Sequence, residues 1–246
     1  MQELRTFVGR FVIVALLIIS LPALLRRLGV VGTSGVLLAF VLIGAIAFYC
    51  ESLILRARRQ SIEKAARLFG FYPGDAADLG LAIRKTGTMR SIVRGQMRGI
   101  ETWLFDYSIS EGEDSLEQTV AAFVVADDNL PIFELCPRGF SGRVEAVSFD
   151  DYYFEYVRFE DMPSFENRFP LKSSAVEHVR RYFKRELLET LLHLEDCKCM
   201  VEGYFTTVVC FTPGVKIPSK ELETFARRCS NVAYALFASG KAPHLV

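Results

Sequence analysis

The sequence predicts an α+β domain in which helices pack on one face of an antiparallel sheet, preceded by a transmembrane helical hairpin. Three observations support this prediction. Two long apolar stretches without charged residues lie within the first 55 of the 246 residues. Alternating polar and apolar residues, typical of strands, follow after Thr88. Helical patterns then return in the last third of the chain, which fits an antiparallel sheet with helices laid over it.

The two apolar stretches are Phe11–Leu25 and Leu28–Cys50, and neither contains a charged residue. A helix needs roughly 20 apolar residues to cross a bilayer. We therefore expect membrane spans at about residues 7–25 and 30–52, joined by a glycine-rich turn. A cleaved signal peptide is the alternative for the first stretch, but Arg26-Arg27 stands where small residues would mark the cleavage site.

Lysine and arginine flank the two ends of this hairpin more densely than its turn. The positive-inside rule then puts both ends in the cytoplasm. The sequence thus predicts a multi-pass protein of the bacterial inner (cytoplasmic) membrane, with the lipid bilayer as its partner and the C-terminal domain in the cytoplasm. Six cysteines fit that compartment as reduced thiols.

Charge is sorted along the chain, although the net charge is zero. Residues 56–99 contain ten basic and three acidic residues, whereas residues 100–170 contain four basic and sixteen acidic ones. We expect a hairpin at 1–55, basic juxtamembrane helices at 56–87 and the cytoplasmic α+β domain at 88–246. The basic residues predicted to contact the membrane surface are Arg56, Arg58, Arg59, Lys64 and Arg67; ordinary positive-inside flanking is the alternative. The acidic body argues against nucleic-acid binding.

The first predicted helix after the hairpin covers Arg56–Phe69, and Gly70 can supply its left-handed C-terminal cap. A short second helix follows Asp75, which can cap its first turn. Both helices have one apolar side, as expected for packing against a sheet.

Strands are predicted next, in segments bounded by turn residues. Residues 88–109 read as strand segments, and the polar stretch 110–115 reads as a hairpin tip. Residues 118–126 and 130–135 give two more strands, separated by Asp127-Asp128-Asn129. Residues 144–159 are strand-like and dense in aromatic side chains.

Helices return towards the C-terminus. Ser174 and Glu177 have the spacing of a capping box and begin a predicted helix that ends near His193. Residues 199–211 contain two strands. A final helix begins after Ser219 and ends at Gly240.

Several strand and turn signatures in this domain form a recurring pattern. They are Arg98-Gly99-Ile100 before Phe105-Asp106-Tyr107, Gln118-Thr119-Val120, Leu130-Pro131, Phe133-Glu134-Leu135, Pro137-Arg138, Phe165–Phe169 and Phe211–Gly214. From about Ile62 onwards the chain resembles a group of bacterial predicted membrane proteins of unknown function. The resemblance implies N-terminal spans and a cytoplasmic domain, and it assigns no catalytic residue.

A possible metal site is the sharpest chemical signal. His193, Cys197, Cys199 and Cys210 are four soft ligands within eighteen residues, and zinc prefers tetrahedral nitrogen and sulfur ligands. The spacing C-x-C is unusual for zinc, and Cys210 lies in an apolar run where a buried cysteine is ordinary. We therefore expect no cofactor, with a zinc ion bound by these four residues as the alternative.

No catalytic motif is present: the sequence has neither a phosphate-binding loop nor a nucleophile elbow. The leading hypothesis is a non-enzymatic, membrane-anchored domain for protein interaction or membrane sensing, with a protein partner or homo-oligomer. The first alternative is a lipid- or small-ligand-binding groove beside the aromatic strand at 149–159. The second is a metal-dependent or acid/base hydrolase that uses the cysteines or the nearby carboxylates, which are Asp150, Asp151, Glu155, Glu160 and Asp161.

Overall fold

The computed structural model describes residues 33–79, 87–111, 114–125, 130–138, 153–194 and 199–240. By compactness the chain divides into two units, Met1–Arg58 and Arg59–Val246. The helix α2, Thr33–Arg67, passes through the boundary between them.

The predicted membrane hairpin is corrected by the structure. In the part of the chain that the structure describes, no helix is both long and apolar enough to cross a membrane. This finding overturns the hairpin in the predicted fold class and the predicted multi-pass placement in the bacterial inner membrane. The first predicted span, 7–25, lies outside the described residues.

Charged residues lie within the helix that covers the second predicted span. Glu51 directly follows the uncharged stretch, and Arg56, Arg58 and Arg59 lie further along α2. Charged side chains are costly inside a bilayer, and the predicted span 30–52 already includes one of them.

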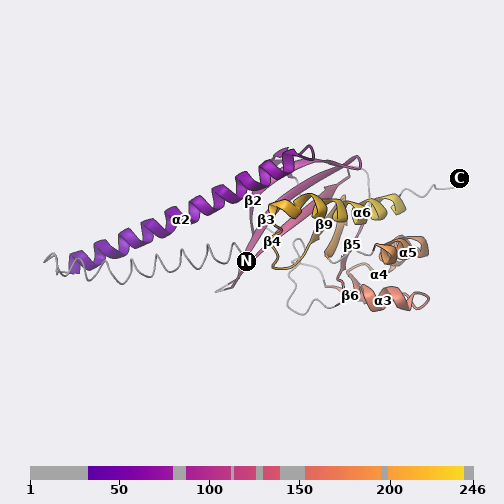
Figure 1. Cartoon of the computed structure of the whole chain (residues 1–246). Helices are drawn as coiled ribbons and strands as arrows, with labels where there is room; N and C mark the ends of the chain where they lie inside the picture. The colour runs from indigo at the N-terminus through magenta and orange to yellow at the C-terminus, as the bar shows by residue number, and fades with distance from the viewer. Residues whose placement is uncertain are drawn as a thin grey trace. The chain divides into compact units, whose positions relative to one another are not determined.

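The second unit is an α+β domain built on a nine-stranded antiparallel sheet (Figure 1). The strand order is β1-β2-β3-β4-β9-β8-β5-β7-β6. The strands are β1 (Tyr72–Pro73), β2 (Gly87–Met97), β3 (Ile100–Glu111), β4 (Asp114–Val124), β5 (Leu130–Leu135), β6 (Glu155–Val157), β7 (Leu171–Ser173), β8 (Met200–Phe205) and β9 (Thr207–Phe211).

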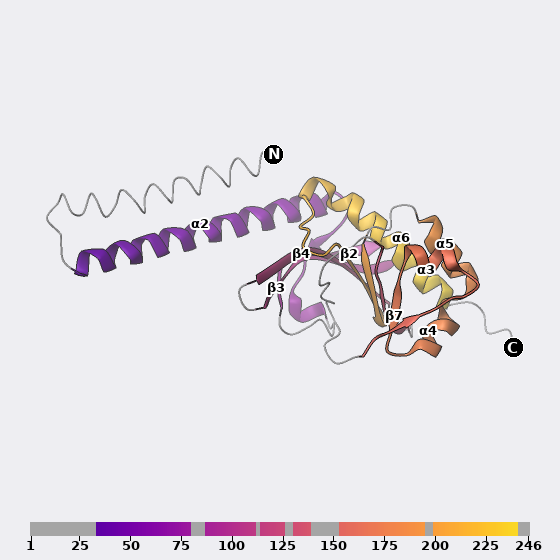
Figure 2. The same ribbon diagram turned by 90° about the horizontal axis from the view of Figure 1, so that it is seen from below.

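Helices connect the later strands and pack on the sheet. They are η1 (Ala76–Leu79), α3 (Pro163–Arg168), α4 (Val176–Tyr182), α5 (Arg185–His193), η2 (Ser219–Glu221) and α6 (Leu222–Gly240). Figure 2 shows α6 lying across the strands, with α3, α4 and α5 gathered at the end of the sheet that carries β7.

The sheet separates two hydrophobic clusters. Adjacent residues such as Leu104 and Phe105 belong to opposite clusters, because successive side chains of a strand point to opposite faces. The larger cluster contains every buried apolar side chain described for α2, α3, α4, α5 and α6. The smaller cluster surrounds Trp103, Phe105 and Tyr107, and its only described contribution from a helical segment is Leu79 of η1. The described α-helices therefore cover one face of the sheet.

One predicted helix is two helices in the structure. The stretch 174–193 breaks at Phe183-Lys184, where α4 ends and α5 begins. Phe183 is buried, and its ring packs edge-on against the Phe133 ring with centroids 4.9 Å apart. Tertiary packing of this aromatic ring, rather than a proline or glycine, interrupts the predicted helix.

Candidate functional site

An open groove lies on the helical side of the domain, between α5, α6 and the turn that joins β2 to β3. Its volume is about 460 Å³. We call it the Arg98 groove, and its lining residues are Arg98, Glu186, Thr190, Leu194, Asn231, Tyr234, Ala235 and Ala238. Volumes of this size are typical of sites for small ligands or for peptide side chains.

The turn between β2 and β3 fixes the position of Arg98. Met97 pairs with Ile100, so the loop has only two residues, Arg98 and Gly99. Both have positive φ angles, 53° and 77°. This is the signature of the type I′ turn, whose twist matches that of the flanking strands. The positively charged side chain of the groove, Arg98, is therefore carried by a short hairpin turn rather than by a long loop.

The guanidinium of Arg98 lies over the ring of Tyr234, with 5.3 Å between the guanidinium carbon and the ring centroid. Both side chains are exposed. Among the described residues Arg98 has no ion pair, so the aromatic ring orients the guanidinium without neutralising it. An arginine in this state presents planar donors that suit a carboxylate.

The other walls of the groove come from α5 and α6. The Thr190 hydroxyl donates to the backbone carbonyl of Glu186 at 2.7 Å, so this hydroxyl is engaged within its own helix. Glu186 and Asn231 add polar groups, and the apolar part of the lining is Leu194, Ala235 and Ala238. The arrangement can bind a carboxylate next to an apolar group, but it holds no nucleophile with an adjacent base.

Sequence reasoning missed this groove because its residues are far apart in the chain and match no motif. Two signals were present in the sequence. Arg98-Gly99 between strand-like segments is a tight-turn dipeptide. Tyr234 is an aromatic residue that falls outside the buried stripe of the last helix, where an exposed ring can mark a contact surface.

The predicted zinc ligands are only partly brought together. Cys199 and Cys210 lie close to each other and to Cys229 of α6, with all three sulfur atoms within 4.8 Å of one another. His193, the last residue of α5, is exposed. Cys197 lies outside the described residues. The third thiol of the cluster was not predicted, because it comes from a helix 19 residues further along the chain.

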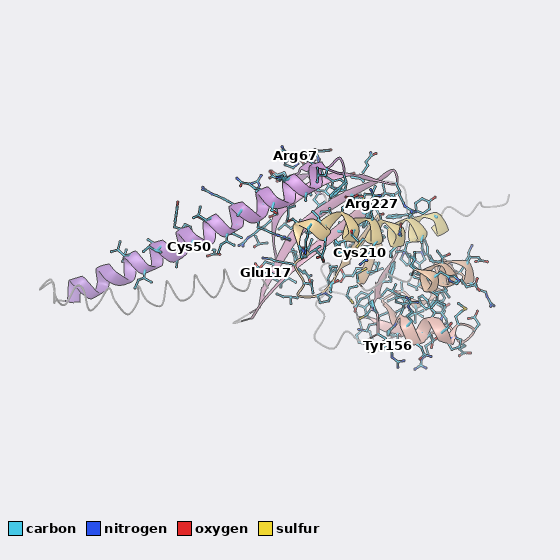
Figure 3. All side chains as sticks on the ribbon, in the orientation of Figure 1. Cys50, Arg67, Glu117, Tyr156, Cys210 and Arg227 are labelled. Atoms are coloured by element: carbon cyan, nitrogen blue, oxygen red, sulfur yellow. The ribbon has the colours of Figure 1, made fainter. Side chains whose placement is uncertain are left out.

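A row of polar side chains crosses four strands near the β6 edge. Glu134 of β5 pairs in register with Glu202 of β8 on one side and with Lys172 of β7 on the other, and Lys172 pairs with Tyr156 of β6. The Lys172 ammonium lies 3.6 Å from the Glu134 carboxylate and 5.5 Å from the centroid of the Tyr156 ring, which Figure 3 labels. Glu202 is fully buried.

Cys136 lies beside this row, but its chemistry does not favour a nucleophile. Burial raises the pKa of the Cys136 thiol, the Glu134 carboxylate raises it further, and Lys172 opposes the shift. The thiol also donates to the carbonyl of Pro137, with a sulfur–oxygen distance of 3.6 Å. Since the thiolate is the reactive form, these surroundings keep Cys136 in the unreactive one.

The remaining predicted site residues are dispersed. The basic residues predicted to contact a membrane surface lie on α2, and one of them, Arg59, pairs with Glu63 at 2.7 Å. Of the acidic candidates, Glu155, Glu160 and Asp161 are exposed, and 150–151 lie outside the described residues.

The aromatic strand divides between the core and the surface. Val157 and Phe159 are buried in the larger cluster, whereas Tyr153 and Tyr156 are 82% and 65% exposed. Where it is described, this strand therefore places its inward-facing side chains in the core rather than along a groove.

Comparisons with known proteins do not assign a family. No protein-family model matches the sequence, and no curated protein matches it. A solved structure with a similar arrangement is the crystal structure of the mycobacterial trehalose monomycolate transport factor A, TtfA. The two sequences are 16% identical. The match covers 74% of this chain and 94% of that protein's chain, with a TM-score of 0.49. At this level of similarity nothing about that protein's function carries over, and the predicted resemblance to bacterial membrane proteins stays a prediction.

Proposed function

We propose that the α+β domain is a non-enzymatic protein-interaction module and that the Arg98 groove is its docking site. The occupant is a segment of a partner protein that presents a carboxylate beside an apolar side chain. The observation that carries this proposal is the Arg98 guanidinium, held over Tyr234 at 5.3 Å with no carboxylate among the described residues to neutralise it.

The chemistry of the groove supports such a partner. A carboxylate bound by the guanidinium forms charge-assisted hydrogen bonds, each worth about 1.5–3 kcal/mol. An apolar side chain next to it can cover Leu194, Ala235 and Ala238. Glu186 also lines the groove and repels a second acidic group, so we expect a single acidic residue beside an apolar one.

The size of the groove favours a weak, transient contact. A cavity of about 460 Å³ accepts a few side chains rather than a whole protein face. We therefore expect affinity for an isolated peptide in the micromolar range, which corresponds to about 7–8 kcal/mol of binding free energy.

The proposal is tested by selecting a phage-displayed library of random peptides on the full-length chain. We expect enrichment of peptides with an acidic residue, or a free terminal carboxylate, beside an aliphatic or aromatic residue. For one synthesised peptide, isothermal titration calorimetry should show that Arg98→Gln weakens binding by about tenfold or more, because a charge-assisted contact is lost.

The matched control is Lys220→Gln, which removes a cation that is 81% exposed in η2, away from the groove. Its affinity should equal that of the unaltered chain. Peptides that bind Arg98→Gln as tightly as the unaltered chain would contradict this site. A selection that enriches no acidic peptide would contradict the proposed partner class.

A further inference from the structure

Three cysteines from separate segments meet in the larger hydrophobic cluster. Cys199 immediately precedes β8, Cys210 lies on β9 and Cys229 lies on α6. We call them the sulfur cluster. They are 8%, 0% and 1% exposed, and their sulfur atoms lie within 4.8 Å of one another. Figure 3 labels Cys210 on the strand beneath α6.

The register of β8 and β9 and the position of α6 explain why the three sulfur atoms lie close together. Cys210 pairs with Val201 across the β8–β9 hairpin. Cys199 is two residues before Val201, so its side chain points to the same face of the sheet. That face is covered by α6, whose buried stripe includes Ala226, Cys229 and Ala233. Small residues around Cys229 let the helix approach the sheet, which brings the third sulfur to the other two.

Thiolates are soft ligands, and among biological cations they select Cu(I) and Zn(II). The number of donors distinguishes the two. Structural zinc is almost always four-coordinate. Among the described His, Cys, Asp and Glu residues, no fourth donor joins these three sulfurs. A set of three sulfur donors suits a three-coordinate cation better than a tetrahedral one.

We propose that Cys199, Cys210 and Cys229 form a buried three-sulfur site for Cu(I). With metal–sulfur bonds of about 2.3 Å, a trigonal site needs sulfur atoms about 4 Å apart. The sulfurs within 4.8 Å therefore need to move by less than an ångström to close on the ion. Cu(I) replaces thiol protons, which pass to water, and no electron is transferred.

The proton balance gives the site a pH dependence. Ligation needs deprotonated sulfur, so metal affinity falls as the solution becomes more acidic. We expect Cu(I) affinity to increase from pH 6 to pH 8.

The test is an anaerobic titration of the reduced, full-length chain with Cu(I) against a chromogenic Cu(I) chelator. We expect one equivalent to be withheld from the chelator, with X-ray absorption showing three sulfur neighbours and no nitrogen. Cys229→Ser should weaken binding by more than about tenfold, since even loss of a residue that only supports a ligand costs 10–100-fold.

Two comparisons keep the test decisive. The double variant Cys50→Ser, Cys136→Ser removes thiols outside the cluster and should bind as the unaltered chain does. If Cys229→Ser fails to fold, the sulfur count on the unaltered chain decides by itself. A nitrogen neighbour, or affinity lost as strongly in Cys197→Ser as in Cys229→Ser, would overturn the three-sulfur site. Failure to compete with the chelator would show that the cluster only packs the core.

Discussion

At the scale of single residues, the hydrogen bonds of one buried threonine connect two segments of the chain. Thr119 of β4 is 1% exposed. Its hydroxyl donates to the Asp106 carboxylate at 2.8 Å and accepts the Ile217 backbone N–H at 2.9 Å. The same residue's N–H donates to Val215 at 3.0 Å. The segment before η2 is thereby fixed to the middle of the sheet.

Replacing Thr119 with Val should destabilise the domain by about 1–3 kcal/mol, because the partly buried Ile217 N–H and the buried Asp106 carboxylate each lose a partner while the volume stays nearly constant. Urea unfolding of the full chain measures the change. The matched control is Thr88→Val on β2, where the threonine is exposed and the same substitution should change little. Equal effects of the two variants would show that the hydrogen bonds of Thr119 add nothing to stability.

Cys136 gives a residue-scale prediction about pH. Burial raises the pKa of its thiol, so the folded state holds this proton more tightly than the unfolded state. The resulting contribution to stability is present below the ordinary thiol pKa of about 8.5 and is lost as the pH rises through the folded value. The rate of alkylation of Cys136 by iodoacetamide should rise at higher pH than that of a free cysteine in a short peptide. Peptide mass spectrometry follows the Cys136 site, and a pH profile that coincides with that of the free peptide would contradict the shift.

At the scale of elements, the β2–β3 hairpin depends on one glycine. Gly99 has a φ angle of 77°, and a methyl group built there would meet nothing within 4 Å. Alanine at this position therefore suffers from backbone strain alone. We expect Gly99→Ala to destabilise the domain by about 1–2 kcal/mol and to disturb the adjacent Arg98.

Gly44→Ala is the opposite case on α2. A methyl group there also meets nothing within 4 Å, but the residue is helical. Alanine is favoured over glycine in a helix by about 1 kcal/mol, so this variant should raise helicity. Circular dichroism and thermal unfolding of both variants check the contrast. A neutral Gly99→Ala would show that the type I′ turn tolerates a side chain.

Elements were predictable from the sequence where local signals decide the structure. The strand pattern in residues 88–109 predicted the strands now seen as β2 and β3, and Gly70 does have the positive φ expected of a helix cap. The break at Phe183 was not predictable, since it arises from the contact of that ring with Phe133. The same holds for the groove, whose Arg98 and Tyr234 meet only after the sheet and α6 are in place.

At the scale of the whole molecule, hydropathy alone led to a wrong prediction. Two apolar stretches suggested a hairpin in a bilayer, whereas no helix within the described ranges is long and apolar enough to span one. The order of the strands in the sheet could not be predicted from local sequence either. Nothing local in β4 shows that its second neighbour is β9 rather than the next strand along the chain. The register pairs Val120 of β4 with Phe211 of β9, which is 91 residues later.

This strand order has a consequence for how the protein folds while it is synthesised on the ribosome. In the described part of the sheet, the late hairpin β8–β9 lies between the meander β1–β4 and the strands β5, β7 and β6. Until that hairpin leaves the exit tunnel, β4 and β5 each present an open edge to solvent or to a neighbouring nascent chain. The domain therefore completes its fold after nearly all of it has been translated. Partly synthesised chains, which still expose these edges, are the species that most need a chaperone.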